Sequence, residues 1–275
     1  MNGKPMHIDS LWIYPIKGCR GQEIKAADIT TEGLAGDRRF VVTSEGQQMG
    51  QKTLPDLKYL SARWQGANLQ LSFKQGTIFE LPDEAEWLDD RLPLIGRSVG
   101  VVDMGPSVAS WLSSQFGRPL RLVSAKAPEP VVLPVPAFAS LEDQGQSKMV
   151  DVAPILLVNQ ASLDDLNARL DEPVPMDRFR ANVVVSGLKP YEEDNLQTLT
   201  LGLLKLKVIT PCERCAVTTF DQRQAETAPS KEPLRTLSTY RRLPTGYAGG
   251  VIFGSYCTVV SEGRLAVGDR LKPAS

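Results

Sequence analysis

Short runs of β-branched, aromatic and aliphatic residues, each ended by a turn signal, constrain the fold of this chain more than any other feature of its sequence. In the first half of the chain these runs occupy residues 7–14, 24–29, 40–43, 57–64, 69–73 and 94–102. Pro15 stops the first run, and the turn-forming residues 66–68 separate two of the others. Because the runs are short and closely spaced, they predict a small antiparallel barrel or sandwich.

Helical spacing of apolar residues is confined to a few short segments. Residues 108–116 form one of them, with Ser107 as the expected N-cap and Gly117 just past its end. Residues 161–170 form an amphipathic helix with leucines on one face, and residues 234–240 form another short helix. The sequence therefore predicts an α+β protein that is mostly β, with a few short helices.

A proline-rich segment, residues 125–136, separates two organised regions of the chain. After it, apolar runs at residues 154–158, 182–186 and 251–260 predict the strands of a second region. At 275 residues the chain is long enough for one large domain or two small ones.

The charge balance and the apolar pattern exclude some classes of function. The chain has 31 basic and 32 acidic side chains, so it lacks the excess of basic residues that binding of a nucleic acid polymer usually requires. No run approaches the roughly 18–20 apolar residues of a membrane span, and residues 1–6 lack the apolar core of a signal peptide. The four cysteines lack the spacing of a disulfide framework, which suits a reducing compartment. We therefore expect a cytoplasmic protein without a membrane or nucleic acid partner.

One short stretch in the second half of the chain contains two closely spaced thiols. Cys212 and Cys215 lie three residues apart, with Arg214 between them. The alternating run before them, residues 203–208, predicts a half-buried strand, and the β-branched run after them, residues 216–220, predicts another extended segment. We expect the thiols at the mouth of a strand–turn–strand, with their short side chains directed into a crevice.

Four interpretations of this Cys-x-x-Cys pair are open. A structural zinc site needs four ligands, and beyond the pair the chain offers only Cys19, Cys257 and His7. A dithiol redox motif needs its first thiol at a helix N-terminus, which the β-forming residues after Cys215 disfavour. Two buried structural cysteines are a common alternative. The remaining interpretation is a thiolate ligand for a soft metal that a cofactor carries.

Four basic residues flank strands at expected loop positions, namely Lys17, Arg38, Arg180 and Arg214. Each of them alone would usually be a solvated surface charge. Together with the thiols they suit an anionic cofactor that carries a phosphate and a soft metal, because guanidinium groups bind phosphate in bidentate fashion and lysine neutralises it. Spacing in the sequence does not show whether the four side chains converge.

Motifs along almost the whole chain are similar to those of a known family. They are residues 14–17 (YPIK), 36–38 (GDR), 179–180 (FR), 182–187 (NVVVSG), 211–219 (PCERCAVTT), 232–241 (EPLRTLSTYR), 253–256 (FGSY) and 267–269 (VGD). In this combination the chain resembles the MOSC family, which is named after the C-terminal domain of molybdenum cofactor sulfurase. Within that family it resembles bacterial proteins that detoxify N-hydroxylated bases and the mitochondrial amidoxime-reducing component.

The resemblance implies a molybdenum–molybdopterin cofactor (Moco) held between two parts of the chain. These are an N-terminal MOSC-associated β-barrel region, residues 1–124, and a MOSC β-barrel domain, residues 125–275. By its place in the motif, Cys215 is implied to be the molybdenum ligand and a catalytic residue, whereas Cys212 is not required as a metal ligand. The implied cofactor-binding residues are Lys17, Gly18, Arg38, Arg180, Cys212, Glu213, Arg214 and Tyr256.

Asp151 matches an acidic position of the family near the cofactor, which implies a catalytic proton donor or orienting group. The alternative for Asp151 is a solvated turn aspartate. Two residues depart from the family pattern: Gly18 stands where serine is frequent, and Glu213 stands where a small polar residue is common.

The activity implied by the resemblance is reduction of N-hydroxylated compounds, such as amidoximes, hydroxylamines and N-hydroxylated nucleobases. Some bacterial relatives continue into a [2Fe–2S] domain, but this chain lacks four closely arranged cysteines for such a cluster. We therefore expect a separate electron donor, either a flavoprotein reductase or a ferredoxin-like protein. The main alternative is a Moco carrier or sulfur-transfer module with a persulfide on Cys212 or Cys215, and a third is a dithiol oxidoreductase.

Overall fold

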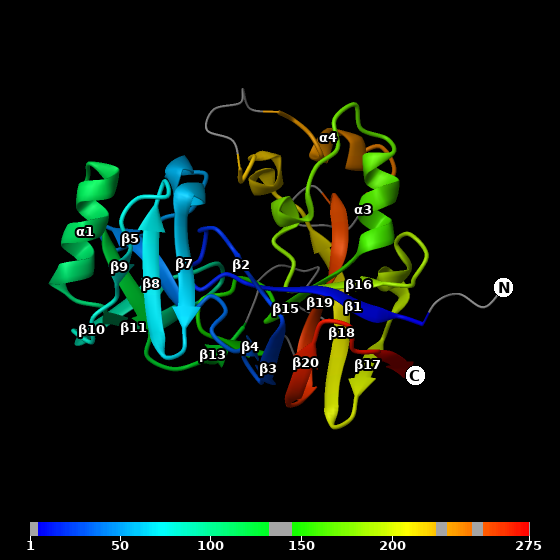
Figure 1. Ribbon diagram of the computed structural model, residues 1–275, viewed down its shortest axis with the longest axis horizontal. Helices are drawn as coiled ribbons and strands as arrows, with labels where there is room; N and C mark the ends of the chain where they lie inside the picture. Colours follow the sequence, from blue (N-terminus) through cyan, green and yellow to red (C-terminus); the bar gives the residue numbers. More distant parts are fainter. Residues whose placement is uncertain (1–4, 132–144, 224–229, 244–249, 275) are drawn as a thin grey trace.

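The computed structural model describes residues 5–131, 145–223, 230–243 and 250–274, and these form two lobes built mainly from strands (Figure 1). The helices are few and short. The α+β, mostly β fold class predicted from the sequence is therefore confirmed. Within the described part of the chain, no helix has the length and apolar character needed to cross a membrane.

The first lobe is organised around an eight-stranded sheet of barrel-like shape, and we call it the eight-stranded lobe. The strand order is β2-β1-β16-β15-β19-β18-β17-β21. The strands are β1 (His7–Ile13), β2 (Gln22–Ile24), β15 (Ile155–Asn159), β16 (Val183–Ser186), β17 (Thr198–Leu201), β18 (Leu204–Glu213), β19 (Ile252–Ser261) and β21 (Lys272–Ala274). β15 and β16 pair in parallel, and the other neighbours pair antiparallel.

A small sheet covers one side of this lobe and shares its core. Its order is β20-β3-β4, formed by β20 (Gly263–Ala266), β3 (Ala26–Thr30) and β4 (Gly33–Leu34). The shared core is aliphatic and fully buried, and includes Ile8, Leu11, Ile29, Ile155, Leu157, Val183 and Leu265. Since side chains alternate between the two faces of a strand, this core takes every second residue of β15 and β16, whereas an irregularity in the pairing of β1 places Ile8 and Leu11 three positions apart.

The second lobe is organised around a five-stranded sheet, and we call it the five-stranded lobe. Its order is β10-β11-β12-β5-β6, with β5 (Phe40–Ser44), β6 (Gln47–Gln48), β10 (Glu86–Pro93), β11 (Ser98–Asp103) and β12 (Arg121–Ala125). A separate sheet of β7 (Leu60–Gln65), β8 (Asn68–Phe73) and β9 (Phe79–Glu80) packs beside it with the helix α1 (Pro106–Phe116). Leu60, Leu71, Val108, Leu112 and Leu122 meet in the core between them.

The N-terminal strands belong to the sheet that the second half of the chain otherwise forms. β1 pairs with β16, with Leu11 opposite Val183. The chain then leaves β1 and runs beside the start of β5, where the Lys17 amide donates to the Phe40 carbonyl at 2.8 Å. This crossing brings Lys17 to the junction between the two lobes. The division into regions 1–124 and 125–275 stays a prediction.

The helices and short 3-10 turns pack against the sheets, and the helix over residues 160–167 places Leu163 and Leu166 in a core with Val158 and Val184. The remaining helices are α3 (Gln160–Asn167) and α4 (Leu234–Leu237), and the 3-10 turns are η1 (Pro55–Tyr59), η2 (Met176–Phe179), η3 (Glu192–Asn195) and η4 (Ala216–Thr219). Gly117 ends α1 in the left-handed conformation, as predicted. The predicted N-cap was wrong: the cap of α1 is Gly105, because Pro106 has the fixed φ that suits the first helical turn.

Two further local predictions were wrong. Residues 216–220 were expected to be extended, but Ala216–Thr219 form η4. The hydroxyls of Thr218 and Thr219 donate to the carbonyls of Cys215 and Ala216, at 3.0 and 2.7 Å, and these bonds outweigh the β preference of threonine. The strand expected over 57–64 begins only at Leu60, because Pro55 starts the turn η1 before it. In the predicted crossing segment, residues 132–136 lie outside the described residues.

Candidate active site

A cavity of about 530 Å³ lies at the junction of the lobes. Its walls come from the turn after β1, the loop after β6, the loop before β15, the turn η2, and the end of β18 with η4. The predicted site residues that line it are Lys17, Gly18, Arg38, Asp151, Arg180, Glu213, Arg214, Cys215 and Tyr256. These side chains come from segments far apart in the sequence and do converge, while their individual roles stay predictions.

The two cysteines have opposite surroundings. β18 ends at Glu213, and the following turn exposes Cys215 on the cavity wall. Cys212 is only 1% exposed and packs in the apolar core around Phe179 and Phe253. Cys215 is thus accessible to a ligand in the cavity, and Cys212 is the one predicted site residue that does not line it.

Arg214 connects the buried thiol to the cavity. Its Nη1 donates to Cys212 Sγ at 2.7 Å, and its Nη2 donates to the Phe179 carbonyl at 2.6 Å. Burial raises the pKa of the Cys212 thiol, although the Arg214 charge and a hydrogen bond from Tyr256 oppose this shift. Arg214 Nε is buried and finds no hydrogen-bond partner among the described residues. The cavity wall therefore contains a buried cationic donor with unused capacity.

Arg38 and Arg180 cross-link the lobes through side chain and backbone. Arg38 Nη1 donates to Asn182 Oδ1 at 2.8 Å, and its Nη2 donates to the Arg180 carbonyl at 3.1 Å. In return, Arg180 Nη1 donates to the Cys19 carbonyl at 2.7 Å. Both arginines have a positive φ, 38° and 56°, a strained backbone region that costs about 1–3 kcal/mol for such residues. The surrounding structure holds both guanidinium groups in place at this cost.

Tyr14 lies against both of these arginines. The guanidinium carbon of Arg180 is 4.2 Å from the centre of the Tyr14 ring, and that of Arg38 is 4.5 Å from it. The Tyr14 hydroxyl donates to the Ala181 carbonyl at 3.2 Å. Burial raises the pKa of Tyr14 to about 12, although both arginine charges oppose the shift. The neutral ring attracts both cations through its π face and offsets part of their mutual repulsion.

Sequence reasoning missed the supporting role of Tyr14, Asp37 and Asn182. Asp37 is buried and forms an ion pair with Arg38 Nη1 at 2.5 Å, and its other oxygen accepts from the Tyr14 amide at 2.7 Å. Asn182 Oδ1 accepts from both Arg38 and the Leu156 amide. The available signal was their place inside the motifs YPIK, GDR and NVVVSG, since each lies within three positions of a predicted site residue.

Asp151 lies on the cavity wall rather than in open solvent. Its Oδ1 accepts from Lys17 Nζ at 2.5 Å, and both side chains keep partial exposure, 33% for Asp151 and 17% for Lys17. This pair joins the turn after β1 to the loop before β15 across the cavity mouth. The interpretation of Asp151 as a solvated turn residue does not describe this contact, and its catalytic role stays a prediction.

Gly18 and Glu213, the two departures from the family pattern, both have defined contacts. Gly18 has a φ of 79°, and its carbonyl accepts from Gln51 Nε2 at 2.8 Å. Glu213 is 6% exposed, and its Oε2 accepts from the Gly250 amide at 3.1 Å. Gly18 therefore contributes backbone to the cavity, and Glu213 contributes a buried carboxylate that the Gly250 amide helps to hold.

The described residues contain no group of three or more His, Cys, Asp or Glu side chains arranged to hold a metal ion. Cys257 is buried in the core of the eight-stranded lobe, and Cys19 is buried in the core of the five-stranded lobe. The zinc interpretation of the Cys-x-x-Cys pair therefore lacks a ligand set in the described part of the chain. The exposed Cys215 thiol remains beside several cationic groups.

Comparisons with known proteins cover both lobes. The model of the MOSC domain matches residues 144–272, and that of the MOSC N-terminal beta barrel domain matches residues 6–119. The chain is 31% identical over 274 residues to mitochondrial amidoxime-reducing component 1 of Homo sapiens, covering 95% of this chain and 81% of that protein. It is 32% identical over 275 residues to mitochondrial amidoxime reducing component 2 of Bos taurus, with coverage of 95% and 81%. Molybdenum cofactor sulfurase of Oryza sativa subsp. japonica is 30% identical over 275 residues, covering 90% of this chain and 32% of that protein.

Proposed function

This chain belongs to the MOSC family, and from that premise we propose that it binds a molybdenum cofactor in the cavity and reduces N-hydroxylated compounds. Relatives that match nearly its whole length are named amidoxime-reducing components. The observation on which the proposal rests is the cavity itself, in which an exposed thiol lies among Lys17, Arg38, Arg180 and Arg214. We propose amidoximes, hydroxylamines and N-hydroxylated nucleobases as substrates.

The residues present fit such a cofactor. Arg214 has a buried Nε without a partner among the described residues, and a polar acceptor in the cavity would satisfy it. Arg38 and Arg180 are held in strained conformations against one aromatic ring, as expected for groups prepared to bind an anion. A thiol such as Cys215 is the kind of donor that soft metal centres take. In this proposal Cys215 binds the metal, and Lys17, Arg38, Arg180 and Arg214 bind the anionic groups.

Reduction of an N-hydroxyl group takes up two electrons and two protons, breaks the N–O bond and releases water. When bound, the cofactor supplies the redox chemistry. The protein then has to orient the substrate and provide protons. We assign the proton-handling role to Asp151, because its carboxylate lines the cavity and its Oδ1 already accepts a hydrogen bond from Lys17 Nζ at 2.5 Å.

The test is a metal analysis combined with a reduction assay. Protein produced in a host that makes the cofactor is expected to contain stoichiometric molybdenum and to reduce benzamidoxime with reduced methyl viologen as the electron source. Stoichiometric zinc without molybdenum would overturn the proposal. Bound molybdenum with no reduction of benzamidoxime, N-hydroxyadenine or phenylhydroxylamine would instead support the alternative function of a Moco carrier or sulfur-transfer module. The electron donor in the cell and the cytoplasmic location are part of the same proposal.

A further inference from the structure

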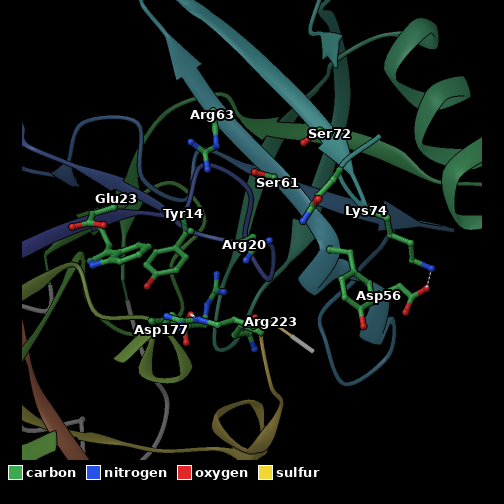
Figure 2. A pocket seen from close by; sticks show the side chains of 16 residues that line it. Tyr14, Arg20, Glu23, Asp56, Ser61, Arg63, Ser72, Lys74, Asp177 and Arg223 are labelled. Atoms are coloured by element: carbon green, nitrogen blue, oxygen red, sulfur yellow. Dashed lines mark hydrogen bonds and ion pairs between the residues drawn. The ribbon is translucent and has the colours of Figure 1, made fainter. Parts of the chain in front are cut away.

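A second and larger cleft, of about 1120 Å³, shares Arg180 with the cofactor cavity, and Figure 2 shows the side chains that line this cleft. One wall is the outer face of the β7–β8 hairpin, and the opposite wall contains Asp177 and Arg223. Most of the lining residues are charged or hydroxyl-bearing, and they include Arg20, Glu23, Asp56, Ser61, Arg63, Ser72, Lys74, Asp177, Arg180 and Arg223. The proposed function does not use this cleft.

Two arginines in the cleft have no partner for their charge. Lys74 pairs with Asp56 at 3.5 Å, and Arg223 pairs with Asp177 at 2.9 Å. In contrast, the exposed side chains of Arg20 and Arg63 form no hydrogen bond or ion pair with any described residue. Figure 2 shows Arg63 and Arg20 on the same side of the cleft, near Ser61 of β7. Of the charged lining residues, five are basic (Arg20, Arg63, Lys74, Arg180 and Arg223) and three are acidic (Glu23, Asp56 and Asp177), so the lining has a net charge of +2 even with the exposed Glu23 included.

The hairpin holds these charges on a rigid surface. Along β7, Leu60 and Ala62 are buried in the core, so Ser61 and Arg63 face outward. The Arg20 amide donates to the Leu60 carbonyl at 3.0 Å, which fixes the backbone of Arg20 beside the same strand. Both guanidinium groups thus extend from backbone that takes part in a hydrogen-bonded sheet.

Shared and directly bonded side chains lie between this cleft and the cofactor cavity. Arg180 lines both hollows. Beside it, Gln222 of the cleft and Gln51 of the cavity exchange hydrogen bonds at 2.8 and 2.9 Å. A partner seated in the cleft would therefore lie very near a cofactor bound in the cavity.

We propose that this cleft is the docking site of an acidic electron-carrier protein that supplies the active site. The inference rests on the proposed function, in which each turnover consumes two electrons. Two molecules of a reduced [2Fe–2S] protein deliver them in succession, one electron each, and both become oxidised in exchange. A polar, charged and open surface is typical of transient redox complexes, in which steering by charge speeds encounter. Small-ligand pockets are usually smaller, about 300–1,000 Å³, and mainly apolar.

The experiment uses plant-type [2Fe–2S] ferredoxin as the acidic probe and compares three purified proteins. They are the wild type, the double variant Arg20→Glu/Arg63→Glu, and the control Arg270→Glu. Arg270 is an exposed arginine outside the cleft, and its side chain has no ion pair among the described residues. Binding of oxidised ferredoxin is measured by titration at low and high salt, and benzamidoxime reduction is measured with reduced ferredoxin and, separately, with reduced methyl viologen.

The wild type and Arg270→Glu are expected to bind ferredoxin at low salt and to lose it at high salt. The double variant is expected to bind about tenfold or more weakly and to lose ferredoxin-driven turnover, because steering by charge is reversed. Its viologen-driven turnover should equal that of the wild type. Equal binding by all three proteins, or no binding by a viologen-active wild type, would overturn the docking proposal. A wild type that is inactive with viologen would refute the proposed function instead.

Discussion

The side chains of Cys212 and Cys215 are only three positions apart, yet one is exposed on the cavity wall and the other is buried beneath Arg214. The difference arises because η4 starts directly after Cys215 and turns the chain outward, while Cys212 still belongs to β18. If Cys215 is a metal ligand and Cys212 is a structural thiol, replacing the first should affect activity much more than replacing the second. A dithiol mechanism does not distinguish them, since both thiols must take part in the disulfide.

Replacing Cys215 by alanine is expected to abolish benzamidoxime reduction while leaving the pterin bound, because the substitution removes the proposed metal ligand. Cys212→Ala should lower activity by no more than about 10–100-fold relative to the wild type. This is the usual effect of replacing a side chain that supports a metal ligand without binding the metal itself. The measurement is viologen-driven turnover per bound molybdenum, with pterin content determined in parallel. Equal losses in both variants, or full activity in Cys215→Ala, would contradict the assignment.

At this scale the sequence predicted more about which residues matter than about how they contact one another. Cys215, Lys17 and the arginines could be named from motifs, because motifs record residue type and order. The contact of Tyr14 with Arg180 could not be predicted, because the two residues are 166 positions apart in sequence and meet only through the pairing of β1 with β16. Arg97 also could not be predicted, because it belongs to none of the motifs, although its side chain bonds to the loop that precedes β15.

At the scale of the elements, the loop that presents Asp151 is held by the side chain of Arg97. Arg97 Nη1 donates to the carbonyls of Glu129 and Ser147, and its Nη2 donates to those of Lys148 and Val150, at distances of 3.0–3.2 Å. Burial lowers the pKa of Arg97, although Glu129 and Asp151 oppose the shift. These bonds connect the loop before β15 to β13 (Glu129–Pro130) and so fix the position of Asp151.

Arg97→Met is therefore expected to destabilise the protein and to loosen this loop. Each hydrogen bond to a charged group is worth about 1.5–3 kcal/mol, so the loss in the free energy of unfolding should be at least that of one such bond. Urea unfolding measures the loss, and hydrogen exchange at residues 145–151 should become faster than in the wild type. Arg91→Met serves as the control, because Arg91 is 55% exposed and should cost less. Equal costs and unchanged exchange at 145–151 would refute this role of Arg97.

Element predictions succeeded where periodicity decides the structure and failed where single side chains decide it. The run at 69–73 became β8, whose residues alternate in burial, and the continuous run at 40–43 became β5, which is buried on both faces. The run at 216–220 became a 3-10 turn, because threonine hydroxyls bond to nearby carbonyls there. Local hydrogen bonds of this kind are not visible in a pattern of apolar and polar residues.

For the whole molecule, the candidate site lies at the junction between the lobes, because residues from both lobes line its cavity. Arg38 bonds to residues 180 and 182, which lead into the eight-stranded sheet, and Arg180 bonds back to residue 19. Sequence spacing could not reveal this convergence, because it depends on how the chain crosses from β1 to β5. Arg38 therefore has two possible roles, one in holding the lobes together and one in holding an anion.

A pair of variants separates these roles. Arg38→Met leaves the carboxylate of Asp37, whose side chain is 2% exposed, without its ion pair, and breaking such a buried pair costs about 3–5 kcal/mol. Burial already raises the pKa of Asp37, with Arg38 opposing the shift, so the pKa should rise further in the variant. The folded variant then binds the proton of the Asp37 carboxyl more tightly than the unfolded chain does. The loss of stability caused by this group should therefore grow as the pH rises above about 4, the ordinary pKa of an aspartate.

The double variant Asp37→Asn/Arg38→Met removes the unpaired charge, and its amide oxygen can still accept from the Tyr14 amide. We expect it to recover much of the stability lost in Arg38→Met and to lose the added pH dependence, both measured by urea unfolding between pH 5 and pH 8. Molybdenum and pterin content should nevertheless stay low in both variants, because neither restores a guanidinium group for the cofactor phosphate. If the double variant regained full cofactor content, Arg38 would act only as a bond between the lobes, and its assignment to the cofactor would be wrong.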